Sequence, residues 1–177
     1  MKGNLIIITS PSGGGKGTLI AELMKRGVGI GYSVSYTTRP MRPNEIEGKD
    51  YSFIGVEEFE RRMANDEFLE FATVHGNYYG TSRTRVESLI AEGVDVILEI
   101  DVQGAADVLK KLPEAVSIFI LPPSWEELRS RLERRGEDAA EIIDLRLKNA
   151  AQEMSEACKF DFVIINEVFE RALFDLK

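Results

Sequence analysis

The sequence predicts an α/β fold: helices cover both faces of a parallel sheet in three layers, with an inserted mixed α/β lobe and a helical lid. Three features of the pattern predict it. Short apolar runs alternate with longer amphipathic stretches, as in repeated βαβ units. One region rich in Tyr, Thr and Gly breaks this alternation, and a later segment carries two charged helical stretches.

The alternating elements follow one another along most of the chain. Four apolar runs are typical of strands buried on both faces: Leu5–Ile8, Val94–Ile100, Val116–Leu121 and Phe160–Ile165. Amphipathic stretches predict helices near 17–26, 83–92, 103–111, 124–135, 138–157 and 167–176.

The region from Ile30 to about Ser82 has a different pattern. Short alternating runs predict small strands, and one amphipathic stretch between them predicts a helix near Val56–Asn65. The predicted strands are Ser33–Thr37, Tyr51–Ile54, Phe68–Thr73 and Asn77–Tyr79. We interpret the region as an inserted lobe.

Bulk composition restricts the class of protein. A length of 177 residues favours one compact domain, and a net charge of −8 argues against a nucleic-acid partner, which would be repelled. No apolar run approaches the roughly 20 residues that cross a bilayer, and the start does not resemble a signal peptide. The single cysteine excludes an intramolecular disulfide. We expect a cytosolic protein that acts on small molecules and needs neither a membrane nor an obligate protein partner.

A glycine-rich loop after the first strand is the strongest local signal. Three glycines precede Lys16, and an amphipathic helix follows. Glycines let backbone N–H groups turn towards phosphate oxygens, and the helix N-terminus favours negative charge at the same place. Lys16 would reach the β- and γ-phosphates. The loop therefore indicates a nucleoside triphosphate but does not identify the acceptor; a plain strand-to-helix turn is the alternative.

The loop departs from the strict phosphate-loop pattern at two positions. Ser10 stands where the pattern has glycine, and Gly17 stands where it has a hydroxyl residue that contacts Mg²⁺. Thr18 supplies a hydroxyl one position later. A metal could instead be held through water and a carboxylate.

Two arginines in the lobe suit a phosphate monoester. Arg39 and Arg42 are each followed by proline, which favours a stiff extended backbone, and a guanidinium can bind two oxygens at once. Downstream, a carboxylate such as Glu70 could pair with the two neighbouring N–H donors of guanine. Taken singly, such charges are more often solvated surface groups; their clustering near a phosphate loop favours binding.

Carboxylates and arginines beyond the lobe have two interpretations each. Glu99 and Asp101 are two apart, so on a strand they would share one face at its carboxyl end, where parallel sheets place ligands. Arg131 and Arg135 are four apart on a predicted helix that Ser124 could cap. The alternative interpretation is that these carboxylates and arginines are ordinary solvated charges, with the arginines paired to nearby glutamates.

Four segments make the chain resemble the guanylate kinase family. They are SPSGGGKGTL, SVSYTTRPMRPNEIEGKDY, EFLEFATVHGNYYGTS and ILEIDVQG, and the likeness runs from Leu5 to about Asn166. The resemblance implies a phosphate-loop core, a GMP-binding lobe and a lid that close around both substrates. It implies transfer of the ATP γ-phosphate to GMP, and to deoxy-GMP, with Mg²⁺.

The resemblance also implies roles for individual residues. ATP would be held by Ser12, Gly13, Gly14, Gly15, Lys16, Gly17 and Thr18, with Asn166 near its base. The GMP phosphate would be held by Arg39, Arg42, Tyr51 and Tyr79, and guanine read by Ser35, Glu70 and Thr81, with Glu99 or Asp101 nearby. Lid arginines Arg131, Arg135 and Arg146 would meet the transferring phosphate, with Lys16 and Arg39 also in the catalytic set, and Asp101 would face the metal through water.

The chain as a whole, 1–177, is interpreted as one domain of this kind. Its expected parts are a core (1–30, 83–123 and 151–177), the GMP-binding lobe (31–82) and the lid (124–150). Two rival functions stay open. One is a phosphotransferase with another small acceptor; the other is a scaffold-type domain that binds partners without turnover, although such domains typically have a degraded phosphate loop.

Overall fold

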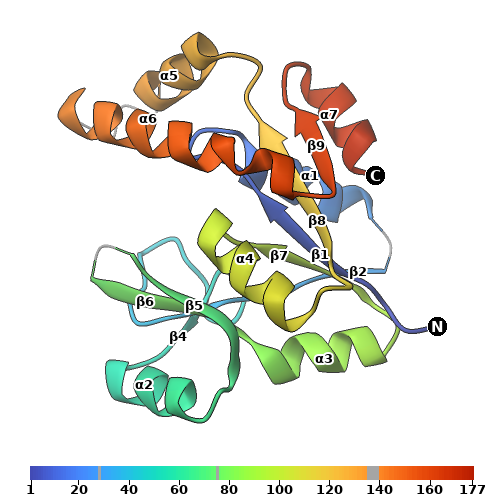
Figure 1. The fold of residues 1–177 in the computed structure, drawn as a ribbon. Helices are drawn as coiled ribbons and strands as arrows, with labels where there is room; N and C mark the ends of the chain where they lie inside the picture. The colour runs from blue at the N-terminus through green and yellow to red at the C-terminus, as the bar shows by residue number, and fades with distance from the viewer. Residues whose placement is uncertain (28, 75, 135–139) are drawn as a thin grey trace. The chain divides into compact units, whose positions relative to one another are not determined.

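The computed structural model describes residues 1–27, 29–74, 76–134 and 140–177. It confirms the predicted α/β class (Figure 1). The strands are β1 (Leu5–Thr9), β2 (Ile30–Tyr32), β3 (Tyr36–Thr37), β4 (Ser52–Phe53), β5 (Phe68–Val74), β6 (Asn77–Ser82), β7 (Asp95–Glu99), β8 (Val116–Leu121) and β9 (Phe162–Ile165). The helices are α1 (Lys16–Arg26), α2 (Val56–Ala64), α3 (Arg83–Ala91), α4 (Val102–Lys111), α5 (Trp125–Arg134), α6 (Ala140–Ser155) and α7 (Phe169–Leu176), with a 3₁₀ turn at Ala157–Lys159.

Within the described residues the strands form two sheets. The larger has the order β2-β7-β1-β8-β9, and its β2–β7, β1–β8 and β8–β9 pairs are parallel, as the alternation of strands and helices requires. The smaller has the order β4-β3-β6-β5, with antiparallel β3–β6 and β5–β6 pairs and a parallel β3–β4 pair.

Internal packing divides the chain into two compact units. The first unit is Met1–Leu5, Gly29–Leu98 and Ala106–Ala115. The second unit is Ile6–Val28, Glu99–Ala105 and Val116–Lys177. The predicted core, lobe and lid boundaries are a different partition and stay a prediction.

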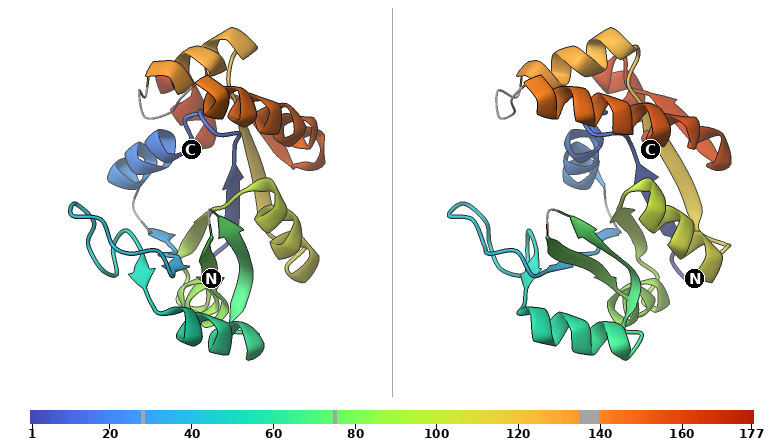
Figure 2. Two further views of the ribbon diagram at one scale, coloured as in Figure 1. Left: turned by 90° about the vertical axis from the view of Figure 1, so that its left-hand side faces the viewer. Right: turned by 60° about the vertical axis from the view of Figure 1, so that its left-hand side comes forward.

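The second unit contains the phosphate loop and the helices that pack around it. Its central strands carry fully buried side chains such as Ile7, Ile8 and Phe119. Helices α5 and α6 lie side by side in both views of Figure 2, joined by a buried cluster of Leu128, Leu132, Ile143, Leu147 and Ala150. Their apolar side chains recur every three or four residues, which places them on one face of each helix.

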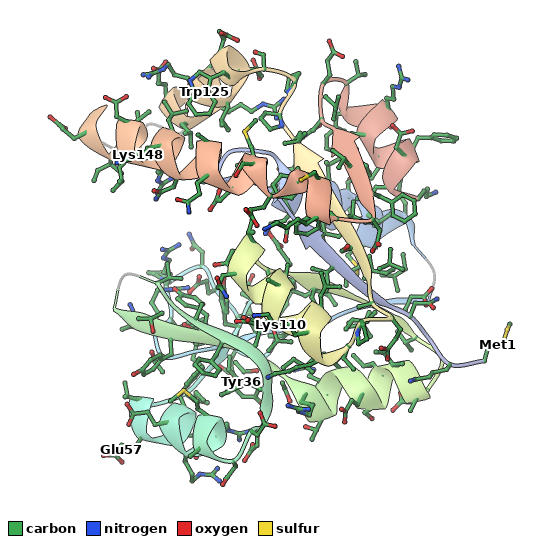
Figure 3. All side chains as sticks on the ribbon, viewed as in Figure 1. Met1, Tyr36, Glu57, Lys110, Trp125 and Lys148 are labelled. Carbon is green, nitrogen blue, oxygen red and sulfur yellow. The ribbon has the colours of Figure 1, made fainter. Side chains whose placement is uncertain are left out.

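The first unit is organised around the smaller sheet. Phe59 of α2 stacks on Phe68 at 4.5 Å and on Tyr78 at 5.1 Å between ring centroids. Gly80 permits this contact, because a Cβ there would lie 2.9 Å from Phe59 Cζ. The Arg62 guanidinium lies 4.9 Å from the ring centroid of Tyr36, which Figure 3 labels. Aromatic packing and this cation–π contact hold α2 against the strands.

Two sequence predictions about strands need correction, and one strand was missed. β9 is not buried on both faces: Phe162, Val163 and Ile165 are 58%, 46% and 59% exposed. It is an edge strand that pairs only with β8 in the described sheet, so it has one neighbour where a central strand has two. The predicted strand Ser33–Thr37 is reduced to β3, and β2 was not predicted. Three residues that begin with a Gly-flanked isoleucine give too short a pattern to identify a strand.

No helix among the described residues is both long and apolar enough to cross a membrane.

Candidate active site

The phosphate loop connects β1 to α1 within the second unit. Gly15 forms the N-cap of α1 with φ 91°, a left-handed conformation that side chains with a Cβ rarely adopt. The Gly14 amide donates to Pro11 O at 2.9 Å, which closes the turn before the glycines. A pocket of about 390 Å³ is lined by this loop, from Ser10 to Thr18, and by Glu99. The backbone is therefore shaped for the close approach of an anion.

Lys16 is the first residue of α1 and points towards the end of β7. Its Nζ donates to Ile100 O at 3.0 Å. Burial lowers the pKa of Lys16, and the carboxylates of Glu99, Asp101 and Glu153 act in the opposite direction. The ammonium is thus held at the loop by a carbonyl and surrounded by negative charge.

Asn166 and Arg131 enclose the other side of the loop. Asn166 is buried and its Nδ2 donates to Gly14 O at 3.0 Å. Arg131 donates to Asn166 O at 2.9 Å and to Gly14 O at 3.4 Å. Together with Gly13 and Thr18 they line a pocket of about 440 Å³. Asn166, predicted near the ATP base, and Arg131, predicted as a lid arginine, thus both contact the phosphate loop.

The other lid arginines differ in what the structure describes. Arg131 also forms an ion pair with Glu127 at 2.8 Å. This is the alternative role given for these arginines in the sequence analysis, and Arg131 therefore combines it with its contacts at the loop. The Glu127 backbone N–H donates to Ser124 Oγ at 3.2 Å, so Ser124 caps the helix, as predicted. Arg146 is partly buried on α6. Arg135 lies outside the described residues.

Glu99 and Asp101 do not share one strand face, which corrects the sequence prediction. Glu99 is the last residue of β7, whereas Asp101 lies beyond the strand and caps α4. Its Oδ1 accepts from Gly104 N at 2.7 Å. A carboxylate that satisfies the free amides at a helix start is a common N-cap, and this local hydrogen bond overrides the strand pattern.

Arg39 is held in the first unit by a carboxylate and by aromatic rings. It donates to Glu45 Oε1 at 2.6 Å and lies 5.6 Å from the ring centroid of Tyr51. The rings of Tyr51 and Tyr79 pack edge to face at 5.8 Å. The hydrogen bond with Arg39 lowers the pKa of Glu45. Three of the four residues predicted for the GMP phosphate are therefore neighbours.

Arg42 is the fourth of these residues and is exposed. Its backbone N–H, not its guanidinium, donates to Glu45 Oε2 at 2.7 Å. Glu45 thus ties both arginine positions together. Sequence reasoning missed it, although a carboxylate three residues after Arg42 in a proline-stiffened loop was a usable signal.

Glu70 and Thr81 form a buried polar pair on neighbouring strands. They lie opposite each other in the β5–β6 register, and Thr81 Oγ1 donates to Glu70 Oε1 at 2.6 Å. Their exposed fractions are 7% and 1%. Ser35 is partly buried and its carbonyl accepts from Ser52 N at 2.9 Å. A carboxylate buried in this way has a fixed orientation suited to paired N–H donors.

Comparison with known proteins identifies the family. The family model for guanylate kinase matches residues 2–177. The chain belongs to the guanylate kinase family. The guanylate kinase of Polaromonas sp. (strain JS666 / ATCC BAA-500) is 59% identical over 175 residues, covering 99% of this chain and 85% of that protein. The guanylate kinase of Neisseria gonorrhoeae (strain ATCC 700825 / FA 1090) is 53% identical, with the same coverage.

A solved structure extends the likeness to the fold of this guanylate kinase family member. The crystal structure of guanylate kinase from Anaplasma phagocytophilum matches with a TM-score of 0.78 and 39% identity, over 99% of this chain and 82% of that one. The resemblance and the phosphate-loop NTPase fold predicted from the sequence are confirmed. The roles of individual residues stay predictions.

Proposed function

We propose that this chain is an ATP:GMP phosphotransferase that forms ADP and GDP and also accepts deoxy-GMP. The observation that carries the choice of acceptor is the buried Glu70–Thr81 pair. The phosphate loop alone does not discriminate among acceptors. A buried carboxylate accepts from the N1–H and 2-amino groups of guanine, whereas adenine has an acceptor at N1.

The donor nucleotide binds at the phosphate loop. Amides from Ser12 to Thr18 and the N-terminus of α1 receive the phosphates, and Lys16 neutralises charge on the β- and γ-groups. Support comes from the left-handed Gly15 and from the pocket lined by the loop. Asn166 lines a second pocket at the loop, together with Gly13 and Thr18, and would lie near the ATP base.

The acceptor phosphate is held by Arg39, Arg42, Tyr51 and Tyr79. This is supported by the contacts of the Arg39 guanidinium with Glu45 and with the ring of Tyr51, which in turn packs on the ring of Tyr79. Glu45 orients Arg39 in advance, so that less side-chain entropy is lost when a phosphate binds. Ser35 and Thr81 complete the recognition of guanine with Glu70.

Phosphoryl transfer here needs positioning and charge stabilisation more than proton removal. The GMP phosphate is already ionised, so no strong base is required. Negative charge spreads over the equatorial oxygens of the transferring group, and Lys16, Arg131, Arg135 and Arg146 stabilise it. The contacts of Arg131 at Gly14 O and Asn166 O support its place beside the donor.

Mg²⁺ accompanies ATP in the proposed reaction. The residues present fit the ion: a Cβ at Gly17, the position that lacks the usual hydroxyl, would lie 3.4 Å from Glu99 Oε1. A carboxylate therefore stands next to the missing hydroxyl, and Asp101 is available to hold a metal-bound water. When bound, the ion neutralises phosphate charge.

An acceptor panel tests this function. ADP release from ATP is measured with GMP, deoxy-GMP, AMP, UMP or shikimate as the sole acceptor. We expect product with GMP and deoxy-GMP only, and none from Lys16→Ala. Product with another acceptor in preference to GMP would refute the assignment. Binding of GMP with no ATP-dependent product would favour a scaffold-type domain.

The proposed setting is the cytosol, with both substrates as small-molecule partners. The single cysteine is exposed and free, which suits a reducing compartment.

A further inference from the structure

Strand β5 has a β-bulge next to the carboxylate that the proposed function assigns to guanine. Phe68 lies opposite Ser82 in the β5–β6 register, whereas Glu70 lies opposite Thr81. Two steps along β5 therefore match one step along β6, and Leu69 is the extra residue. In a register without the bulge, Leu69 would lie opposite Thr81, and Glu70 would be on the other face of the sheet. The bulge thus determines which side chain Thr81 meets.

Burial makes this choice of side chain important for recognition. Leu69 is 0% exposed, and Glu70 is 7% exposed with Thr81 Oγ1 donating to it at 2.6 Å. An apolar side chain opposite Thr81 would offer guanine no acceptor and would leave the buried hydroxyl without this partner. The backbone at Phe68 and Leu69 therefore controls where the Glu70 carboxylate lies.

Lys111, the last residue of α4, binds the backbone at the bulge. Its Nζ donates to Leu69 O at 2.7 Å and to Phe68 O at 3.3 Å. All three residues belong to the first unit. An ammonium has three N–H donors, so it can bind two successive carbonyls where a bulge interrupts the ladder. Hydrogen bonds from a charged donor are stronger than those from a neutral one. Lys111 therefore ties both residues of the bulge to α4.

A short ion-pair network extends from Lys111 to the end of β6. Asp66 Oδ1 lies 3.9 Å from Lys111 Nζ, and Asp66 Oδ2 accepts from the Arg83 guanidinium at 2.8 Å. Arg83 begins α3 directly after β6, and its backbone N–H donates to Glu67 O at 2.9 Å. The Asp66 side chain is 77% exposed, so its ion pairs contribute little. The two carbonyl hydrogen bonds are therefore the main contribution of Lys111.

We infer that Lys111 is a positioning residue for guanine recognition: its hydrogen bonds to the carbonyls of Phe68 and Leu69 keep the bulge that places Glu70 opposite Thr81. Lys111 acts through Glu70 and does not itself contact the base. A lysine that only attached α4 to β5 would affect stability and leave the selectivity for guanine unchanged. This inference rests on the proposed function, because it requires Glu70 to bind guanine.

The test compares Lys111→Met, Lys111→Arg and the matched control Lys110→Met. Lys110, which Figure 3 labels, is the preceding residue of α4, is 73% exposed and pairs with Asp107 at 3.0 Å. The dissociation constants of GMP, IMP and ADP are measured by calorimetry for each variant. IMP has the N1–H of GMP but lacks its 2-amino group, so it offers Glu70 one donor in place of two. The folded state is checked by circular dichroism and thermal unfolding.

We expect Lys111→Met to weaken GMP binding by about 10- to 100-fold, the usual cost of losing a hydrogen bond to a charged acceptor. IMP binding should weaken less, so the preference for GMP over IMP should shrink by about fivefold or more. ADP binding should change by less than about twofold. Lys111→Arg keeps charged N–H donors, so it should recover most of the GMP affinity, and Lys110→Met should match wild type within about twofold.

Three results would overturn the inference. One is a folded Lys111→Met variant with an unchanged preference for GMP over IMP, whatever its melting temperature. Another is an equal loss of ADP affinity. The third is a Lys111→Arg variant as weak as Lys111→Met. If Lys111→Met does not fold, Lys111→Gln takes its place: it should bind GMP about threefold or more weaker than Lys110→Met, and equal affinity would overturn the inference. A wild-type chain that forms no product with GMP would instead refute the proposed function itself.

Discussion

Replacement of Gly15 by alanine probes how the phosphate loop is built. Gly15 has φ 91°, and a Cβ at this position would lie 2.3 Å from Asn166 Nδ2. The substitution therefore destabilises the fold in two ways. The backbone is left-handed, and the side chain of Asn166 must leave its hydrogen bond to Gly14 O.

The magnitude follows from these two effects. A left-handed alanine costs about 1–2 kcal/mol. Because Asn166 is buried, the loss of its hydrogen bond leaves a buried polar group without a partner, at about 1–3 kcal/mol. The free energy of unfolding should fall by about 2–5 kcal/mol. For a chain of this length the melting temperature should drop by about 4–20 °C.

Two glycines serve as controls for the separate contributions. Gly48 has φ 73°, and a Cβ added there would meet nothing within 4 Å, so Gly48→Ala incurs the backbone cost alone. Gly17 is in α1 and has no left-handed conformation, so Gly17→Ala should be neutral or slightly stabilising.

Urea and thermal unfolding of the three variants, followed by circular dichroism, give the free energies. Binding of ADP measured in parallel reports on the loop itself. If Gly15→Ala were no less stable than Gly48→Ala and bound ADP normally, the contact with Asn166 would have no energetic importance. The shape of the loop would then not depend on a glycine at this position.

Three further predictions follow from individual contacts. Glu99→Gln should reduce the Mg²⁺-dependent gain in ADP affinity by about tenfold without changing the affinity for ADP without metal, and the hydroxyl added by Gly17→Ser should restore that gain. Calorimetry with and without Mg²⁺ measures both effects, and an unchanged gain in Glu99→Gln would contradict the prediction. Thr81→Val removes the donor to Glu70 and should lower kcat/KM for GMP by about 10-fold or more, while the KM for ATP is unchanged. Steady-state kinetics with each substrate varied would contradict this if the KM for ATP changed to a similar extent. Asp161 accepts hydrogen bonds from the amide and hydroxyl of Ser117, which lower the pKa of Asp161 below its usual 3.8, so its stabilising effect is present above pH 3.8 and is lost as pH falls through the lower folded pKa. In thermal unfolding, Asp161→Ala should melt below wild type at pH 7, and the difference in melting temperature should shrink towards pH 2–3. A difference that stays constant with pH would exclude the linkage.

The elements that the sequence predicted well are those whose signal is contiguous. The phosphate loop, from β1 into α1, depends on glycines and Lys16 that are neighbours along the chain. The central strands could be recognised because burial on both faces requires unbroken apolar runs such as Val116–Leu121. The family resemblance assigned Glu70 and Thr81 to the same base, but it did not predict their direct opposition in the β5–β6 register.

The exposed strand β9 shows where a sequence pattern is insufficient. Its residues are as apolar as those of β8, yet three of the four are exposed. The number of neighbours that a strand has in its sheet determines its burial, and the strand's own composition does not contain that number. Asp101 is a similar case, because a hydrogen bond to Gly104 N made it a helix cap.

What the sequence alone determined is therefore the local chemistry: a phosphate-binding loop, paired arginines and an alternating α/β pattern, each written in adjacent residues. Only the tertiary structure decided which distant groups meet at that loop. Asn166 and Arg131 reach it from separate elements far along the chain. The physical reason is that hydrogen bonds and burial depend on distance in space, and packing of α5, α6 and β9 sets that distance.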